Sequence, residues 1–210
     1  RYEKILNDKQ VMLVRVLDLF AGAGGFSLGF EMAGFEIVAA IEKDEWTSET
    51  LKNNHPTTKV ITANIEDISD DYLNEQFFGK GIDVIIGGPP CQGFSIANRN
   101  AGDPKDPRNS LFEEFIRVVN IVQPRVVVME NVPNLLRAKN QNDEKVIDII
   151  MQEFKKIGYT GEYQIMNAAH FGVPQIRNRL FIIVSREEGL ADLFPEQMYV
   201  PINEERGIFN

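Results

Sequence analysis

The single cysteine of the chain, Cys91, stands where a nucleophile would be useful. It follows the apolar run 84–86, which predicts a buried parallel strand, and two prolines, Pro89 and Pro90, which keep the chain extended. Open α/β sheets place their chemistry at the carboxyl ends of such strands. Because most cysteines are structural and buried, this position alone leaves a catalytic thiol and a structural thiol equally open.

Three further side chains could assist a nucleophile. Glu130 directly follows the apolar run 125–129, and a carboxylate at a buried strand end is costly unless it has partners or a task. Arg177 and Arg179 alternate in an extended stretch, so they are expected on one side, able to bind phosphates or a base carbonyl. A salt-bridged glutamate and a solvated arginine pair are the ordinary alternatives. No histidine is close to Cys91 in sequence, which weakens a protease-like Cys–His pair.

A glycine-rich turn and an acidic residue indicate a nucleoside-binding site. The turn 22–25 lets the backbone approach a ligand and opens a helix, and Glu42, 20 residues after Gly22, can bind a ribose diol. The dinucleotide fingerprint requires a third glycine where this chain has Ser27, so NAD is disfavoured without being excluded. Close packing of a strand against a helix is the structural alternative for these glycines.

Alternating strand and helix patterns must position these residues. Strands are expected at 14–20, 35–41, 59–62, 82–86, 125–129, 159–168 and 180–185, and helices at 26–33, 45–54, 69–78, 110–122 and from an Asp143 cap to 157. This order predicts an α/β fold with a doubly wound, mostly parallel sheet. In such a sheet the residues after strand ends share one ligand crevice. Here they are 22–25, Glu42, Asn64, Cys91 and Glu130.

Composition excludes several classes of protein. The chain has 210 residues, 43% hydrophobic and 25% charged, which is typical of a globular domain, and we find no apolar run that predicts a membrane span. One cysteine rules out an internal disulfide and indicates a reducing compartment. Because the chain has only one cysteine and two histidines as candidate soft ligands, no metal site is expected. The net charge of −9 argues against a wholly basic nucleic-acid binder but permits a local basic groove.

Four motifs together resemble the DNA cytosine-5 methyltransferases that depend on S-adenosylmethionine. Segment 18–25 (DLFAGAGG) resembles that family's cofactor signature, and 90–92 (PCQ) its nucleophile signature. Segment 130–132 (ENV) resembles its acidic segment, and 175–179 (QIRNR) its arginine signature. The motifs occur in the family's order and span residues 14 to 185, and four ordered motifs are far more specific than one.

The resemblance implies a Rossmann-like site for S-adenosylmethionine. Phe20 would stack on the adenine and Glu42 would bind the ribose. Asn64 stands where the family usually has an aspartate, and its side-chain oxygen can still accept from the adenine amino group. The other cofactor contacts that the resemblance implies are Ala21, Gly22, Gly25, Lys43, Ile65, Pro90 and Leu111.

The resemblance also implies methyl transfer to carbon 5 of a cytosine in double-stranded DNA. A Cys91 thiolate would add to carbon 6, and Glu130 would stabilise N3 and the exocyclic amine. Arg179 would hold the base O2, and Arg177 would support the loop or the thiolate. The base must be flipped out of the duplex, and the loop 96–109 would close over it. Substrate contacts are expected from Gln92, Ser95, Arg99 and Gln175.

Other functions stay open beside this one. A tRNA cytosine-5 methyltransferase of the same fold is the nearest, although the continuation 93–95 (GFS) looks more like the DNA enzymes. A catalytically inactive subunit that binds cofactor or DNA is another, against which the intact Cys91, Glu130 and arginines argue. A zinc base deaminase fails for lack of a paired-cysteine motif.

The chain is expected to consist of two regions. Residues 1–189 are expected to form the cofactor-binding and catalytic domain, and residues 190–210 a linker or the start of an absent target-recognition region. The tail is acidic, which is unsuited to phosphates, so the remaining DNA surface is expected from absent sequence or a second subunit. The 210-residue chain alone should therefore methylate little. The setting expected is a prokaryotic cytoplasm, near the nucleoid, as part of restriction–modification.

Overall fold

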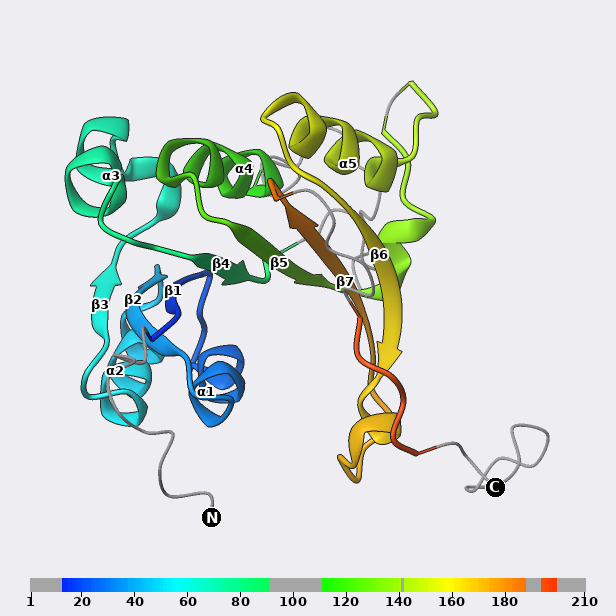
Figure 1. Ribbon diagram of the computed structural model, residues 1–210, viewed down its shortest axis with the longest axis horizontal. Coiled ribbons are helices and arrows are strands. Elements are labelled where there is room, and N and C mark those ends of the chain that lie inside the picture. The colour runs from blue at the N-terminus through cyan, green and yellow to red at the C-terminus, as the bar shows by residue number, and fades with distance from the viewer. Residues whose placement is uncertain (1–12, 91–110, 141, 188–193, 200–210) are drawn as a thin grey trace, which may run out of the picture.

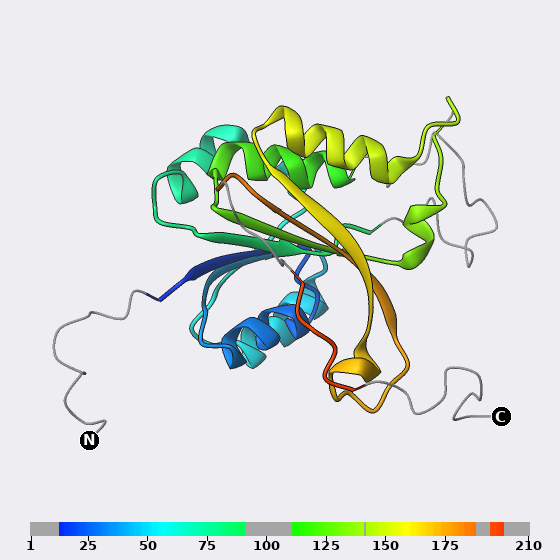
Figure 2. The same cartoon turned by 45° about the vertical axis from the view of Figure 1, so that its right-hand side comes forward.

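The chain folds into one seven-stranded sheet with helices on both faces (Figures 1 and 2). The computed structural model describes residues 13–90, 111–140, 142–187 and 194–199. Within them, the helices α1 and α2 cover one face, and α3, α4 and α5 cover the other (Figure 2). The predicted doubly wound α/β fold is therefore confirmed.

The sheet is parallel except at one edge. Its spatial order is β3-β2-β1-β4-β5-β7-β6. The first five strands pair in parallel, whereas β7 is antiparallel to both β5 and β6. The strand bounds are Arg15–Leu19 (β1), Glu36–Glu42 (β2), Lys59–Thr62 (β3), Val84–Gly87 (β4), Val126–Asn131 (β5), Thr160–Asn167 (β6) and Asn178–Ser185 (β7).

The helices lie at the positions expected from the apolar periodicity. Their bounds are Gly25–Met32 (α1), Glu45–Asn54 (α2), Asp70–Phe77 (α3), Leu111–Val122 (α4) and Val146–Lys156 (α5), with short 3-10 turns at Ile65–Asp67 (η1), Pro133–Leu136 (η4) and Ala168–Phe171 (η5). Asp44 caps α2 by accepting from Thr47 N at 2.7 Å, and Ser69 caps α3 by accepting from Tyr72 N at 3.2 Å.

Two details of the expected elements are wrong. Asp143 does not cap α5; Lys145 precedes that helix without a side-chain cap bond. Asp143 instead has a φ of 64° and accepts from Lys139 Nζ at 2.7 Å, because the side chain of Asn140 organises this turn by accepting from the backbone N–H of Glu144 at 3.0 Å. The last strand begins two residues earlier than expected, at Asn178, which places Arg179 in β7. Ser110, the first residue of the helix expected at 110–122, lies outside the described residues.

Apolar side chains on the central strands serve two cores. Leu17 and Leu19 belong to the large core under α3, α4 and α5, whereas Val16 packs in a smaller core with Phe26 and Phe30 of α1. Because successive strand residues point to opposite faces, a strand buried on both sides needs a continuous apolar run. Asp18 interrupts that run on the α1 side, where Ser27 of α1 meets it.

Parallel pairing brings the carboxyl ends of β1 to β5 to one edge of the sheet. Gly87, at the end of β4, is pressed against β1, since a Cβ at this position would lie 2.1 Å from the carbonyl oxygen of Leu19. The β6–β7 hairpin extends past this edge, with η5 at its tip (Figure 1). The loops after the strands and this hairpin therefore surround one crevice.

Candidate active site

The glycine-rich turn is held in place by the end of α2. Gly24 has a φ of 90°, and a Cβ there would lie 2.2 Å from His55 Nε2. His55 is buried, and its Nε2 bonds the Gly24 carbonyl at 3.0 Å while its Nδ1 bonds Glu31 at 2.9 Å. Asn54 donates to the carbonyl of Ala23 at 3.0 Å. A side chain at Gly24 would displace His55, so glycine is required there.

The smaller of two cavities at the crevice has a volume of about 220 Å³. Its lining includes seven of the residues expected at a cofactor site, which are Phe20, Glu42, Lys43, Asn64, Ile65, Pro90 and Leu111. Ile41, Ala63 and Gly88 also line it and are not expected from the motifs. The loops after β1, β2 and β3 thus converge with the start of α4 on one small pocket.

Two polar side chains of this pocket are oriented by the protein itself. Glu42 accepts from the backbone N–H of Gly22 through Oε2 and from that of Asp44 through Oε1, both at 2.9 Å. Each carboxylate oxygen keeps a lone pair for a ligand hydroxyl. Asn64 donates through Nδ2 to Glu66 at 3.1 Å. Because a carboxylate only accepts, the Asn64 carbonyl oxygen is the end left to accept from a ligand.

Phe20 separates this pocket from a larger one. It lines both cavities together with Gly88, so the two cavities meet at these residues. Phe20 has a φ of 58°, a backbone conformation that is uncommon for a residue with a side chain. Such conformations persist where the surrounding structure imposes them, often at ligand sites.

The larger cavity has a volume of about 570 Å³ and is lined by five more of the expected residues. Glu130, Arg177 and Arg179 line it, as do Ala21 and Gly25 of the glycine-rich turn. The lining also includes residues that were not expected at the site, which are Asp18, Phe26, Met166, Ala168, Phe171 and Phe181. The rings of Phe26 and Phe181 meet edge to face at 6.2 Å, joining α1 to β7.

Glu130 and Arg179 form an ion pair in the larger cavity. Arg179 Nε lies 2.7 Å from Glu130 Oε1, and the two side chains are 24% and 29% exposed. Burial raises the pKa of Glu130, although the guanidinium groups of Arg179 and Arg177 partly oppose this. A Cβ at Gly88 would lie 3.1 Å from Glu130 Oε2, so this oxygen abuts the segment that leads to Cys91. The carboxyl therefore takes up a proton more readily than an exposed glutamate, at a point of the cavity that Gly88 also lines.

The arginine motif runs from the hairpin loop into β7. Arg177 N donates to the Asn167 side chain at 3.2 Å, and the Arg177 carbonyl accepts from Ala168 N at 3.0 Å. These bonds fix the backbone from which the Arg177 and Arg179 side chains reach the cavity, on the same side as the alternation predicts. Gln175 is exposed and is absent from the lining of both cavities. Gly22 is also absent from both linings, and its backbone N–H is bonded to Glu42.

Asp18 lies in the 18–25 motif, but the sequence analysis did not predict a functional role for it. It is fully buried, and its Oδ2 accepts from Ser27 Oγ at 2.6 Å, while Oδ1 has no hydrogen-bond partner among the described residues. Burial raises its pKa from the ordinary value of 3.8 to about 7. The available signal was a lone carboxylate within the apolar run 16–20.

Some expected groups cannot be placed. Cys91, Gln92, Ser95 and Arg99 lie outside the described residues, as does the loop 96–109. Pro90, which lines the smaller cavity, is the last described residue before Cys91. Where the chain is described, no cluster of His, Cys, Asp and Glu could hold a metal ion. No helix in the described segments has the length and apolar character to cross a membrane.

Known proteins resemble the chain over nearly its whole length. Type II methyltransferase M.DdeI of Desulfomicrobium norvegicum is 47% identical over 170 residues, which are 81% of this chain and 40% of that protein. Type II methyltransferase M1.HphI of Haemophilus parahaemolyticus is 42% identical over 195 residues, which are 91% and 51% of the two chains. The chain thus spans about half the length of these relatives.

A solved structure shares the fold. It is that of a prophage-encoded protein of E. coli assigned as a DNA modification methyltransferase, with a TM-score of 0.71 and 31% identity, over 85% of this chain and 49% of that one. The family model of the C-5 cytosine-specific DNA methylases matches residues 14–206. With described residues of all four motifs lining the crevice, this fold and these relatives, the chain belongs to the C-5 cytosine-specific DNA methylase family.

Proposed function

We propose that the protein transfers a methyl group from S-adenosylmethionine to carbon 5 of cytosine in DNA. The observation that carries the proposal is the meeting of two cavities at Phe20 and Gly88. One has the groups that a nucleoside requires, and the other has a proton-holding carboxyl paired with an arginine. Relatives named Type II methyltransferases support the same activity and a restriction–modification setting.

The described residues fit the cofactor. In the smaller cavity Phe20 would face the adenine, Glu42 would accept from the ribose hydroxyls, and the Asn64 oxygen would accept from the adenine amino group. In the larger cavity the unpartnered Oδ1 of Asp18 suits the ammonium group of the methionine part. When bound, S-adenosylmethionine supplies an electrophilic methyl group on its sulfonium.

The chain's own residues would activate the base. The Cys91 thiolate adds to carbon 6 of a flipped-out cytosine, and Glu130 delivers its proton to N3, so that carbon 5 becomes nucleophilic. Arg179 holds O2 with the N–H donors that remain beyond its bonds to Glu130 and the Asn178 carbonyl. Loss of the carbon 5 proton to water, with the N3 proton returning to Glu130, then restores the double bond between carbons 5 and 6 and expels the cysteine thiolate. Arg177 would support this arrangement from the hairpin loop.

The DNA surface and the setting belong to the same proposal. Gln92, Ser95, Arg99 and Gln175 would contact DNA, with further contacts from sequence outside this chain or from a second subunit. The acidic balance of −9 supports this, because duplex binding depends on lysine and arginine. Residues 1–189 would be the catalytic domain, residues 190–210 would lead toward target recognition, and the protein would act in the cytoplasm near the nucleoid.

Covalent trapping tests the function. Bisulfite sequencing of DNA from cells that express the full-length protein identifies the methylated cytosine. A duplex with 5-fluorocytosine at that position should then form a stable complex with the protein, because carbon 5 can no longer lose a proton. Cys91→Ala should abolish trapping while the variant keeps its S-adenosylhomocysteine affinity. Trapping that persists in Cys91→Ala, or the absence of any converted cytosine, would contradict the proposal.

A further inference from the structure

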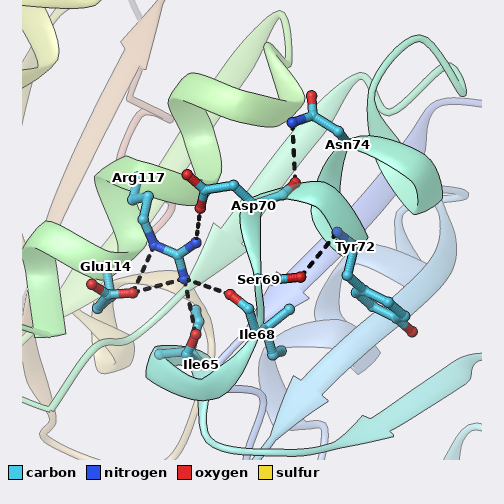
Figure 3. A network of polar contacts seen from close by, with 8 residues as sticks. All are labelled: Ile65, Ile68, Ser69, Asp70, Tyr72, Asn74, Glu114 and Arg117. Atoms are coloured by element: carbon cyan, nitrogen blue, oxygen red, sulfur yellow. Dashed lines mark hydrogen bonds and ion pairs between the residues drawn. The ribbon is translucent and has the colours of Figure 1, made fainter.

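Arg117 on α4 uses all three guanidinium nitrogens in contacts with the η1 turn, with the start of α3 and with Glu114 of its own helix (Figure 3). Its Nη2 donates to the carbonyls of Ile65 at 2.9 Å and Ile68 at 3.2 Å. Its Nε donates to Glu114 at 2.8 Å, and its Nη1 pairs with Asp70 at the start of α3. One half-buried side chain thus joins α4 to both the turn and the next helix.

The chemistry of the turn explains why an arginine is used. The turn's own bond from Ile68 N to the Ile65 carbonyl is long, at 3.3 Å, and the Ile68 carbonyl lies just past the turn. Arg117 therefore gives the Ile65 carbonyl a second donor and also supplies a donor to the Ile68 carbonyl. The guanidinium is a flat fork with five N–H donors, and it reaches two carbonyls and two carboxylates at the same time. A lysine ammonium is a compact point charge and cannot span these four acceptors.

The turn that Arg117 holds is part of the smaller cavity. Asn64 and Ile65, at the start of η1, line that cavity, and upstream Ala63 N donates to the carbonyl of Glu42 at 3.0 Å. The wall 63–65 is therefore fixed at one end by β2 and at the other by Arg117. Asn64 is in turn oriented by Glu66, which lies within η1. A displaced turn would move both wall residues.

We infer that Arg117 is a positioning residue for the adenine end of the cofactor site, acting through Asn64 and Ile65 without itself lining the cavity. This inference rests on the proposed function, which places the adenine against that wall. The same helix also contributes Leu111 to the cavity, so α4 supplies one wall directly and braces another. Loss of the guanidinium should allow the wall 63–65, which would accept from the adenine amino group, to shift. The larger cavity should be unchanged.

The experiment compares Arg117→Met with Arg125→Met in the full-length protein. Arg125 is a matched control, because it is ion-paired to Glu187 at 2.6 Å at the opposite end of β5, away from both cavities. We expect calorimetry to show S-adenosylhomocysteine bound about tenfold more weakly by Arg117→Met, which is about 1.4 kcal/mol, and unchanged in Arg125→Met. The KM for S-adenosylmethionine should rise similarly, with a much smaller change in kcat.

A second ligand separates positioning from general destabilisation. S-inosylhomocysteine has a carbonyl oxygen in place of the adenine amino group, so the wild type should prefer S-adenosylhomocysteine, and Arg117→Met should lose much of that preference. Equal affinity and unchanged preference in Arg117→Met would overturn the inference while the proposed function stands. If Arg117→Met does not fold, Arg117→Lys is measured in the same way and decides the question. A wild type that binds neither ligand would overturn the proposed function instead.

Discussion

The two cavities share Phe20 and Gly88 but are built differently. The smaller one is lined mainly by loops after consecutive strands, and its polar groups hold one another, as Glu42 does with Gly22. The larger one draws its lining from residues as distant as Asp18 and Phe181. It includes two carboxyl groups whose pKa is raised by desolvation, the buried Asp18 and the half-buried Glu130.

This difference indicates two kinds of task. A wall whose hydrogen bonds are already made loses little freedom on binding, which suits firm retention of a small ligand. A wall with carboxyl groups that are costly to ionise suits proton transfer and the binding of a cation. Substitutions should therefore separate binding, which depends on the smaller cavity, from chemistry, which depends on the larger one.

Glu130→Gln should have the largest effect of these substitutions, a loss of catalysis in the larger cavity. The amide cannot deliver a proton, so kcat should fall by about 10²- to 10⁴-fold, while affinity for S-adenosylhomocysteine stays within about twofold. Burial raises the pKa of Glu130, and its carboxyl loses its proton as pH rises through this raised pKa. The kcat of the wild type should therefore fall toward alkaline pH. This fall should be absent in Glu130→Gln, whose amide does not titrate. Glu187→Gln, which alters an exposed arginine partner, is the control. An equal loss in both variants would contradict the assignment.

Asp18→Asn should change how stability depends on pH. The unfolded carboxyl ionises near 3.8 and the folded one near 7, so the folded state binds the extra proton between these values. The free energy of unfolding should then fall as pH rises through that window, by up to about 4 kcal/mol from this group. Urea unfolding at pH 4.5 and pH 8 should show a shallower dependence in Asp18→Asn.

The same unfolding measurement with bound S-adenosylhomocysteine tests where the ammonium group of the ligand lies. An ammonium group beside Asp18 favours the ionised carboxylate, so saturating S-adenosylhomocysteine should reduce the pH dependence of the wild type. A pH dependence that is identical with and without this ligand would place the ammonium group elsewhere.

Glu42→Ala should weaken the smaller cavity alone. The variant loses the acceptor that we propose for the ribose and leaves the N–H groups of Gly22 and Asp44 without their partner. We expect S-adenosylhomocysteine affinity to fall by about 1–3 kcal/mol. With saturating cofactor, kcat should change much less than in Glu130→Gln. Unchanged affinity in calorimetry would remove Glu42 from the cofactor site.

A pair of glycine substitutions should have the smallest and most local effects. Gly24→Ala puts a Cβ against His55 at a φ of 90°, and should cost about 1–3 kcal/mol of stability and weaken cofactor binding. Gly29→Ala, on the open side of α1, meets nothing within 4 Å and should stabilise the protein by about 0.5–1 kcal/mol. Thermal unfolding of both variants measures these changes. A stability change of the same sign in both would show that the contact with His55 of α2 does not constrain the turn.

Local patterns were sufficient for the parallel part of the sheet. The apolar runs that become β1 and β4 are buried on both faces, and the run of β5 is buried on one face and half-buried on the other. Such continuous apolar runs can be recognised in the sequence alone. Parallel pairing brings their carboxyl ends together whatever the side chains are, so residues after strand ends could be grouped in advance. That is why Glu42, Asn64 and Glu130 were expected at one crevice, and why they line its two cavities.

The antiparallel edge and the turns were less predictable. The expected Asp143 cap failed because the backbone N–H of Val146, three residues further on, donates to the carbonyl of Ala138 at 3.0 Å, while Asn140 accepts from Glu144 N in the preceding turn. Bonds of this kind depend on local geometry that composition does not record. The start of β7 at Asn178 follows from its pairing with Asn167, a partner eleven residues earlier across the hairpin.

By itself, the sequence determined the fold class, the order of the motifs and the edge of the sheet where they gather, because these depend on periodicity and on short spacings. Only the tertiary structure decided which side chains brace the site. Arg117 reaches Ile65 across 52 positions and His55 reaches Gly24 across 31. Asp18 keeps an oxygen without a partner in the described structure because α1 supplies only Ser27. Such contacts depend on how helices pack against the sheet, and packing brings together residues that no local pattern connects.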